Sequence, residues 1–119
     1  MAASFLPLDA LRLPLLCAPM SFASSLPLTL ACARAGIVVG WQGGNVASIE
    51  AFEAVLVALD AAAAEAPLAP HLINFPTRIV DDPDLGAAKL RLCARHQVPL
   101  VMSSVGNPAL LPVISGTIS

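Results

Sequence analysis

An asparagine interrupts an apolar segment in the middle of the chain. Asn74 stands between Ile73 and Phe75, and its side chain carries two hydrogen-bond donors and an acceptor. Burying an amide without partners costs a few kcal/mol, so Asn74 must bind backbone, water or the amide edge of a ligand. The residues alone leave a structural role and a ligand-binding role equally open.

Pro19 and Met20 follow the first apolar run, Leu13–Ala18. A proline at this point can simply end a strand, and methionine is a common filler of gaps in a core. Alternatively, the two residues form a flat apolar shelf with exposed backbone groups, which would suit an aromatic cofactor ring. Both interpretations are kept at this stage.

The two histidines are weaker candidates for catalysis. His71 begins the segment that contains Asn74, and His96 ends a later helix, where the helix dipole favours a basic group. Neither is expected at the end of a strand where a general base would be needed. We find no Ser–His–Asp set, no metal-ligand spacing and no carboxylate pair, so we predict no metal site.

The cysteines do not predict a disulfide framework or a zinc site. They are odd in number and widely spaced, without a CxxC motif. This pattern is typical of reduced, buried thiols in a cytosolic protein. The three are Cys17, Cys32 and Cys93.

Short apolar runs alternate with longer amphipathic segments, and the candidate residues lie at their boundaries. Strands are expected over 13–18, 37–40, 71–75 and 100–104, because these segments are apolar and often β-branched. Ser25, Ser48 and Asp82 are expected to begin three helices, with Gly36 ending the first and a fourth helix over Ala109–Ile114. The third helix is expected to carry one face of Leu85, Ala88, Leu92 and His96.

This βαβαβαβ order indicates a parallel sheet with right-handed crossovers. The turn after the first strand, residues 18–24, contains no glycine, so it lacks the phosphate-binding fingerprints of doubly wound sheets. We therefore expect a (β/α)8 TIM barrel. A complete barrel takes about 250 residues, whereas this chain has 119. Residues 1–119 are thus expected to be a single truncated domain with about the first four βα units.

The composition limits the partners and the compartment. The chain is 57% hydrophobic and 12% charged, with a net charge of −2, which excludes a disordered tail and a basic nucleic-acid surface. Arg34 and Asp60 interrupt the longest apolar stretches, which argues against a membrane span. Asp9 and Arg12 interrupt the first run, which argues against a secretory signal. We expect a cytoplasmic protein without a nucleic-acid or membrane partner.

Four segments resemble, in order, motifs of the nitronate monooxygenases, formerly called 2-nitropropane dioxygenases. Residues 15–20, which end in Ala-Pro-Met, resemble that family's first-strand motif, and residues 33–40 resemble its next helix-to-strand junction. Residues 72–75 and 101–108 are similar to its third and fourth strand ends. The resemblance runs from about Leu13 to Pro112.

The resemblance implies an FMN-dependent oxidoreductase that oxidises alkyl nitronates with O2. It implies that Ala18, Pro19, Met20 and Asn74 line the flavin, with the Asn74 amide on the polar edge of the isoalloxazine. The family's catalytic histidine and phosphate-binding loops lie later in the barrel, beyond Ser119. No catalytic residue is therefore expected in this chain, and the chain alone is expected to be inactive.

One segment departs from the family, and two alternatives stay open. Residues 41–45 are bulkier than the family's usual Gly/Ser-rich turn, which could reshape the substrate side. One alternative is a related flavin barrel, such as an enoyl reductase or an IMP dehydrogenase-like protein. The other is a non-catalytic half barrel that assembles as a homodimer, because its first and fourth strands would be edges that invite pairing.

Overall fold

Four parallel strands form one sheet in the part of the chain that the computed structural model describes, residues 11–76 and 83–107. The strands lie in the order β1-β2-β3-β4, which is their order in the sequence, and all neighbours run parallel. The elements are β1 (Leu16–Cys17), α1 (Leu26–Arg34), β2 (Val38–Gln42), the 3-10 turn η2 (Gly43–Asn45), α2 (Ile49–Glu65), β3 (His71–Pro76), α3 (Pro83–Arg95) and β4 (Leu100–Ser104).

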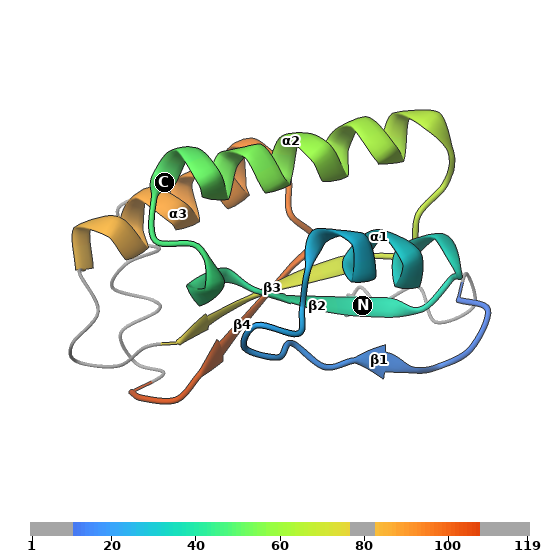
Figure 1. Cartoon of the computed structure of the whole chain (residues 1–119), viewed down its shortest axis with the longest axis horizontal. Helices are drawn as coiled ribbons and strands as arrows, with labels where there is room; N and C mark the ends of the chain where they lie inside the picture. Colours follow the sequence, from blue (N-terminus) through green and yellow to red (C-terminus); the bar gives the residue numbers. More distant parts are fainter. Residues whose placement is uncertain (1–10, 77–82, 108–119) are drawn as a thin grey trace, which may run out of the picture.

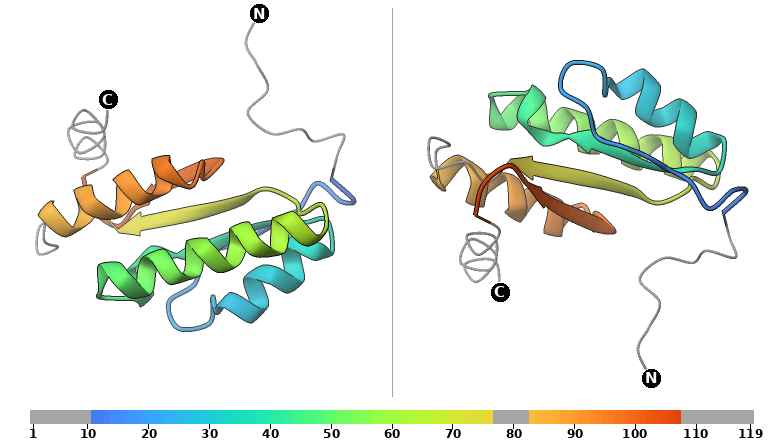
Figure 2. Two further views of the ribbon diagram at one scale, coloured as in Figure 1. Left: turned by 90° about the horizontal axis from the view of Figure 1, so that it is seen from above. Right: turned by 90° about the horizontal axis from the view of Figure 1, so that it is seen from below.

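The three helices cover the same face of the sheet (Figure 1). Figure 2 shows this from both sides: the helices lie in front of the strands from above and behind them from below. When each strand is followed by its neighbour in the sheet and all crossovers are right-handed, every connecting helix packs on the same face of the sheet. The fold is therefore α/β with a parallel sheet, and it is compatible with part of an α/β barrel.

The helices begin where the sequence predicted. Ser25 Oγ accepts a hydrogen bond from Leu28 N at 3.2 Å, and Ser48 Oγ accepts one from Ala51 N at 3.1 Å. Each serine thus satisfies a backbone N–H that has no partner within its helix. Gly36 follows α1 with φ +83°, a conformation that glycine adopts without strain.

The core lies between the sheet and helices α2 and α3. Phe52 of α2 packs between Trp41 of β2 and Phe75 of β3, with ring centroids 5.5 and 6.1 Å apart. Alternation along the strands sends these residues toward the helices. The remaining buried members of the cluster are Leu56, Leu59, Ile73, Leu90, Leu92 and Cys93.

The first strand is shorter and more exposed than the sequence predicted. A buried strand was expected over 13–18, whereas β1 covers Leu16–Cys17, and Leu16 is 47% exposed. Leu16 is exposed because β1 is an edge strand of the described sheet. Leu16 also pairs with Val38, so its side chain points to the face that the three helices leave uncovered. The prediction of a buried first strand is wrong.

The end of a second strand and one helix face also differ from the prediction. Strand β2 continues to Gln42, beyond the predicted end at residue 40. Helix α3 buries Lys89, whereas Ala88 of the predicted face is only half-buried. Strand β4 matches its prediction. The predicted cap Asp82 and the predicted fourth helix lie outside the described residues.

No helix in residues 11–76 and 83–107 is long and apolar enough to cross a membrane.

Candidate functional site

A polar cluster lies on the uncovered face of the sheet, near the carboxyl ends of three neighbouring strands. Asn74 of β3 donates from Nδ2 to Gln42 Oε1 of β2 at 2.8 Å and to Ser104 Oγ of β4 at 2.8 Å. The register explains the contact, because Gln42 pairs directly with Asn74 and paired residues point to the same face. The carboxyl ends of parallel strands are where ligands bind in α/β folds.

The acceptor of the Asn74 amide has no partner in the described part of the chain. Asn74 is only 2% exposed, and its Oδ1 accepts no hydrogen bond from the described residues. A buried polar atom in this state costs about 1–3 kcal/mol. The amide donors thus have the structural role considered for Asn74, while Oδ1 has no donor among the described residues.

The predicted segment 18–20 borders the same face. Pro19 packs on Gly40 of β2 so closely that a Cβ at residue 40 would lie 2.6 Å from Pro19 Cδ. Gly40 precedes Gln42 by two residues, so it points to the same face as the polar cluster. Ala18 is exposed, and Met20 is 43% exposed, so Met20 does not fill the core. Pro19 and Asn74 therefore share one face.

A pocket of about 460 Å³ opens at the carboxyl edge of the sheet. None of the four predicted flavin contacts lines it. Its walls come from the β1–α1 and β2–α2 connections, the end of β3, the start of α3 and the residue after β4: Ser21, Phe22, Gln42, Gly43, Gly44, Asn45, Val46, Ala47, Phe75, Pro76, Leu85, Gly86, Lys89 and Val105.

Lys89 is the residue in this pocket that sequence reasoning missed. It is 7% exposed, and its Nζ donates to Gly43 O at 3.0 Å and to Val46 O at 2.8 Å. The ammonium group also lies 5.4 Å from the Phe52 ring centroid, within cation–π range. The sequence does carry a signal for the burial of Lys89. Residue 89 lies four positions after Leu85 and four before Cys93, so the three share one face of the helix.

The histidines lie elsewhere. His71 begins β3, at the opposite end from the polar cluster, as predicted. Burial lowers the pKa of His71 below 6.5, and the charge of Asp60 partly opposes this.

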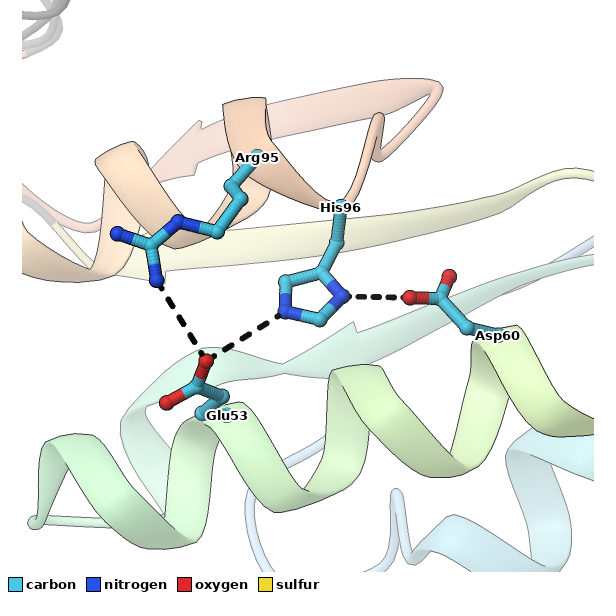
Figure 3. A network of polar contacts seen from close by, with 4 residues as sticks. All are labelled: Glu53, Asp60, Arg95 and His96. Carbon is cyan, nitrogen blue, oxygen red and sulfur yellow. Dashed lines mark hydrogen bonds and ion pairs between the residues drawn. The ribbon is translucent and has the colours of Figure 1, made fainter.

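His96 joins a network between α2 and α3 (Figure 3). Its Nδ1 lies 2.5 Å from Asp60 Oδ2, and its Nε2 lies 3.8 Å from Glu53 Oε1. Glu53 Oε1 also lies 3.7 Å from an Arg95 guanidinium nitrogen. These side chains lie between the helices, so this network holds α2 and α3 together and is separate from the candidate site.

Among residues 11–76 and 83–107, no group of three or more His, Cys, Asp or Glu side chains could hold a metal ion. The polar contacts described at the candidate site involve the amides of Asn74 and Gln42, the Ser104 hydroxyl and the Lys89 ammonium group. No protein-family model matches the chain, and no curated protein matches it.

Proposed function

We propose that these four βα units are the first part of a (β/α)8 barrel in an FMN-dependent oxidoreductase that resembles the nitronate monooxygenases. The sequential strand order and the single helical layer support a barrel. A doubly wound sheet reverses its strand order at a switch point and carries helices on both faces. In a barrel, the uncovered face becomes the packed interior.

The observation that carries the flavin proposal is the unsatisfied acceptor of Asn74. An isoalloxazine presents an N–H donor on its polar edge, and a buried amide oxygen can accept a hydrogen bond from it. Ala18, Pro19 and Met20 would form the apolar wall beside the ring. The Asn74 oxygen is closed to solvent, so side chains around it must shift to admit the ring edge.

FMN, when bound, would supply the redox chemistry between a small-molecule alkyl nitronate and O2. The protein positions such a cofactor and tunes its electronics. In this proposal Gln42 and Ser104 orient the Asn74 amide through its two donors, which fixes the direction of the acceptor. We assign the base and the phosphate-binding loops to barrel units other than these four.

The test uses the cellular polypeptide that contains this sequence, isolated at its natural length. We expect it to carry FMN and to consume O2 with a nitroalkane anion. Asn74→Ala should raise the Kd for FMN roughly tenfold, because one buried hydrogen bond is worth about 1 kcal/mol or more. The measurement is flavin fluorescence during titration of the apoprotein.

Ser104→Ala is the matched control. It removes one partner of the Asn74 amide but keeps the Oδ1 acceptor, so FMN affinity should change much less than in Asn74→Ala. Equal affinities in the wild type and Asn74→Ala would remove Asn74 from the cofactor site. Flavin binding without nitronate oxidation would favour a related flavin barrel, such as an enoyl reductase or an IMP dehydrogenase-like protein.

A second candidate function is assembly. Strands β1 and β4 are both edges of the described sheet, and Leu16 and Val101 beside these edges are exposed apolar residues. Two copies related by a twofold axis could pair β1 of one with β4 of the other, all in parallel. Such a homodimer would close an eight-stranded barrel without any catalytic role.

A further inference from the structure

The pocket at the carboxyl edge of the sheet has the size of a small-molecule site. Its volume of about 460 Å³ lies within the range of roughly 300–1,000 Å³ that is typical of ligand pockets. Its described walls combine apolar side chains with a few polar ones, among them Gln42. None of the four proposed flavin contacts lines it, so this pocket is separate from them.

Gln42 presents a hydrogen-bond donor to this pocket. The residue lines the pocket and is only 9% exposed, and its Oε1 accepts a hydrogen bond from Asn74 Nδ2 at 2.8 Å. That bond orients the amide, so Nε2 points away from Asn74. Nε2 has no acceptor among the described residues, and unlike Asn74 Oδ1 it is not closed to solvent. A ligand in the pocket can therefore supply the missing acceptor.

Two exposed apolar side chains on strained backbone line the same pocket. Phe22 is 95% exposed and Val105 is 54% exposed, and both belong to the pocket wall. Their φ angles are +65° and +48°, in the left-handed region that is uncommon for residues other than glycine and an outlier for a β-branched valine. Backbone strain of this kind clusters at ligand clamps.

Asn45 holds the Phe22 backbone at the pocket. Asn45 belongs to η2, and its Oδ1 accepts a hydrogen bond from Phe22 N at 3.1 Å. This bond joins the β1–α1 connection to the β2–α2 connection, so the phenyl ring stays at the pocket although almost none of it is covered by protein. The flat face of an aromatic ligand would cover such a ring.

We propose that this pocket binds a small, flat aromatic ligand that carries a carbonyl oxygen. The oxygen accepts a hydrogen bond from Gln42 Nε2, while the ring packs against Phe22 and Val105. This contact removes the exposed apolar surface of both side chains from water. The inference is independent of the proposed flavin function, because it rests on the pocket residues alone.

NMR of the chain labelled with ¹⁵N-glutamine tests the proposal, with benzamide as the probe. The sequence contains two glutamines, Gln42 and Gln97, and Gln97 lies beyond the end of α3 that is remote from the pocket. Benzamide should shift the side-chain NH₂ signal of Gln42 and leave that of Gln97 unchanged. Acetamide lacks the ring and toluene lacks the carbonyl, so each should bind at least about tenfold more weakly. An unchanged Gln42 signal up to the solubility limit of benzamide would overturn the proposal.

Phe22→Gly separates a ligand-binding role from a structural one. It should raise the Kd for benzamide roughly five- to tenfold, because the aromatic contact is lost. It should not lower the midpoint of urea unfolding, since the side chain is 95% exposed and glycine adopts a φ of +65° without strain. Val57→Ala is the control, because Val57 is an exposed apolar residue of α2 outside the pocket, and it should leave the Kd unchanged.

Two results would count against the proposal. An unchanged Kd in Phe22→Gly would remove Phe22 from the ligand site. Displacement of benzamide by excess FMN would put the flavin ring in this pocket and overturn the assignment of a separate site.

Discussion

Buried polar side chains in this fold differ in how many of their hydrogen-bonding groups have a partner. Asn74 has partners for both donors but none for its acceptor among the described residues. Native proteins leave few buried polar groups in this state, and each one calls for an explanation. We propose a ligand donor as this explanation, since Asn74 lies near the carboxyl ends of the strands, where ligands bind in α/β folds.

His71 gives a prediction at the same scale. Because burial lowers its pKa below 6.5, the unfolded chain binds a proton more readily than the folded chain as the pH falls through that value. The free energy of unfolding should therefore decrease from about pH 7 to pH 5 and should not depend on His71 above about pH 7. Urea denaturation at a series of pH values measures this.

In the variant His71→Gln, the free energy of unfolding should depend less on pH between about pH 7 and pH 5, since glutamine does not titrate. His96→Gln is the control, because it leaves His71 at the start of β3 and should retain the slope that His71 causes. Identical slopes for the wild type and His71→Gln would show that His71 is not responsible.

At the scale of elements, Lys89 joins α3 to the turn that follows β2. Its two hydrogen bonds satisfy the carbonyl groups of Gly43 and Val46, which lie beside the pocket. Gly43 itself has no room for a side chain, because a Cβ there would come 2.8 Å from Asn74 O. The turn can therefore approach β3 closely, and Lys89 holds it from the other side.

We predict that Lys89→Met destabilises the fold by about 2–3 kcal/mol, since buried hydrogen bonds from a charged group are lost and their acceptors stay buried. The measurement is the midpoint of urea unfolding. Arg91→Met is the matched control, because Arg91 lies on the same helix with an exposed side chain, and it should change stability by less than about 0.5 kcal/mol. Equal effects of the two variants would contradict the proposed role of Lys89.

At the scale of the whole molecule, the uncovered face and the two sheet edges bear on the assembly hypothesis. If two copies close a barrel, light scattering of the purified 119-residue chain should give twice the chain mass. Leu16→Lys should return it to the monomer mass, because Leu16 points to the face that would become the barrel interior, where an unpaired charge is costly.

Val57→Lys is the control for this experiment. Val57 is also exposed, but it lies on α2, on the helical layer and away from both sheet edges. The substitution Val57→Lys should therefore leave the mass of the assembly unchanged. A wild-type chain that stays monomeric at all concentrations would exclude the homodimer and leave the flavin barrel as the proposal.

The sequence by itself determined the elements and their order. Ser25, Ser48 and Gly36 specify helix ends through local hydrogen bonds and backbone freedom, which depend only on neighbours in the chain. These predictions agree with the structure because each rests on short-range physics.

Only the tertiary structure decided which residues meet. The hydrogen bonds from Asn74 to Gln42 and Ser104 depend on strand register, and the exposure of Leu16 depends on β1 being an edge. Helical spacing places Lys89 on the buried face of α3, but the carbonyl groups that accept its hydrogen bonds lie more than forty positions away in the chain. Such contacts join distant segments, so no local pattern of residue types could specify them.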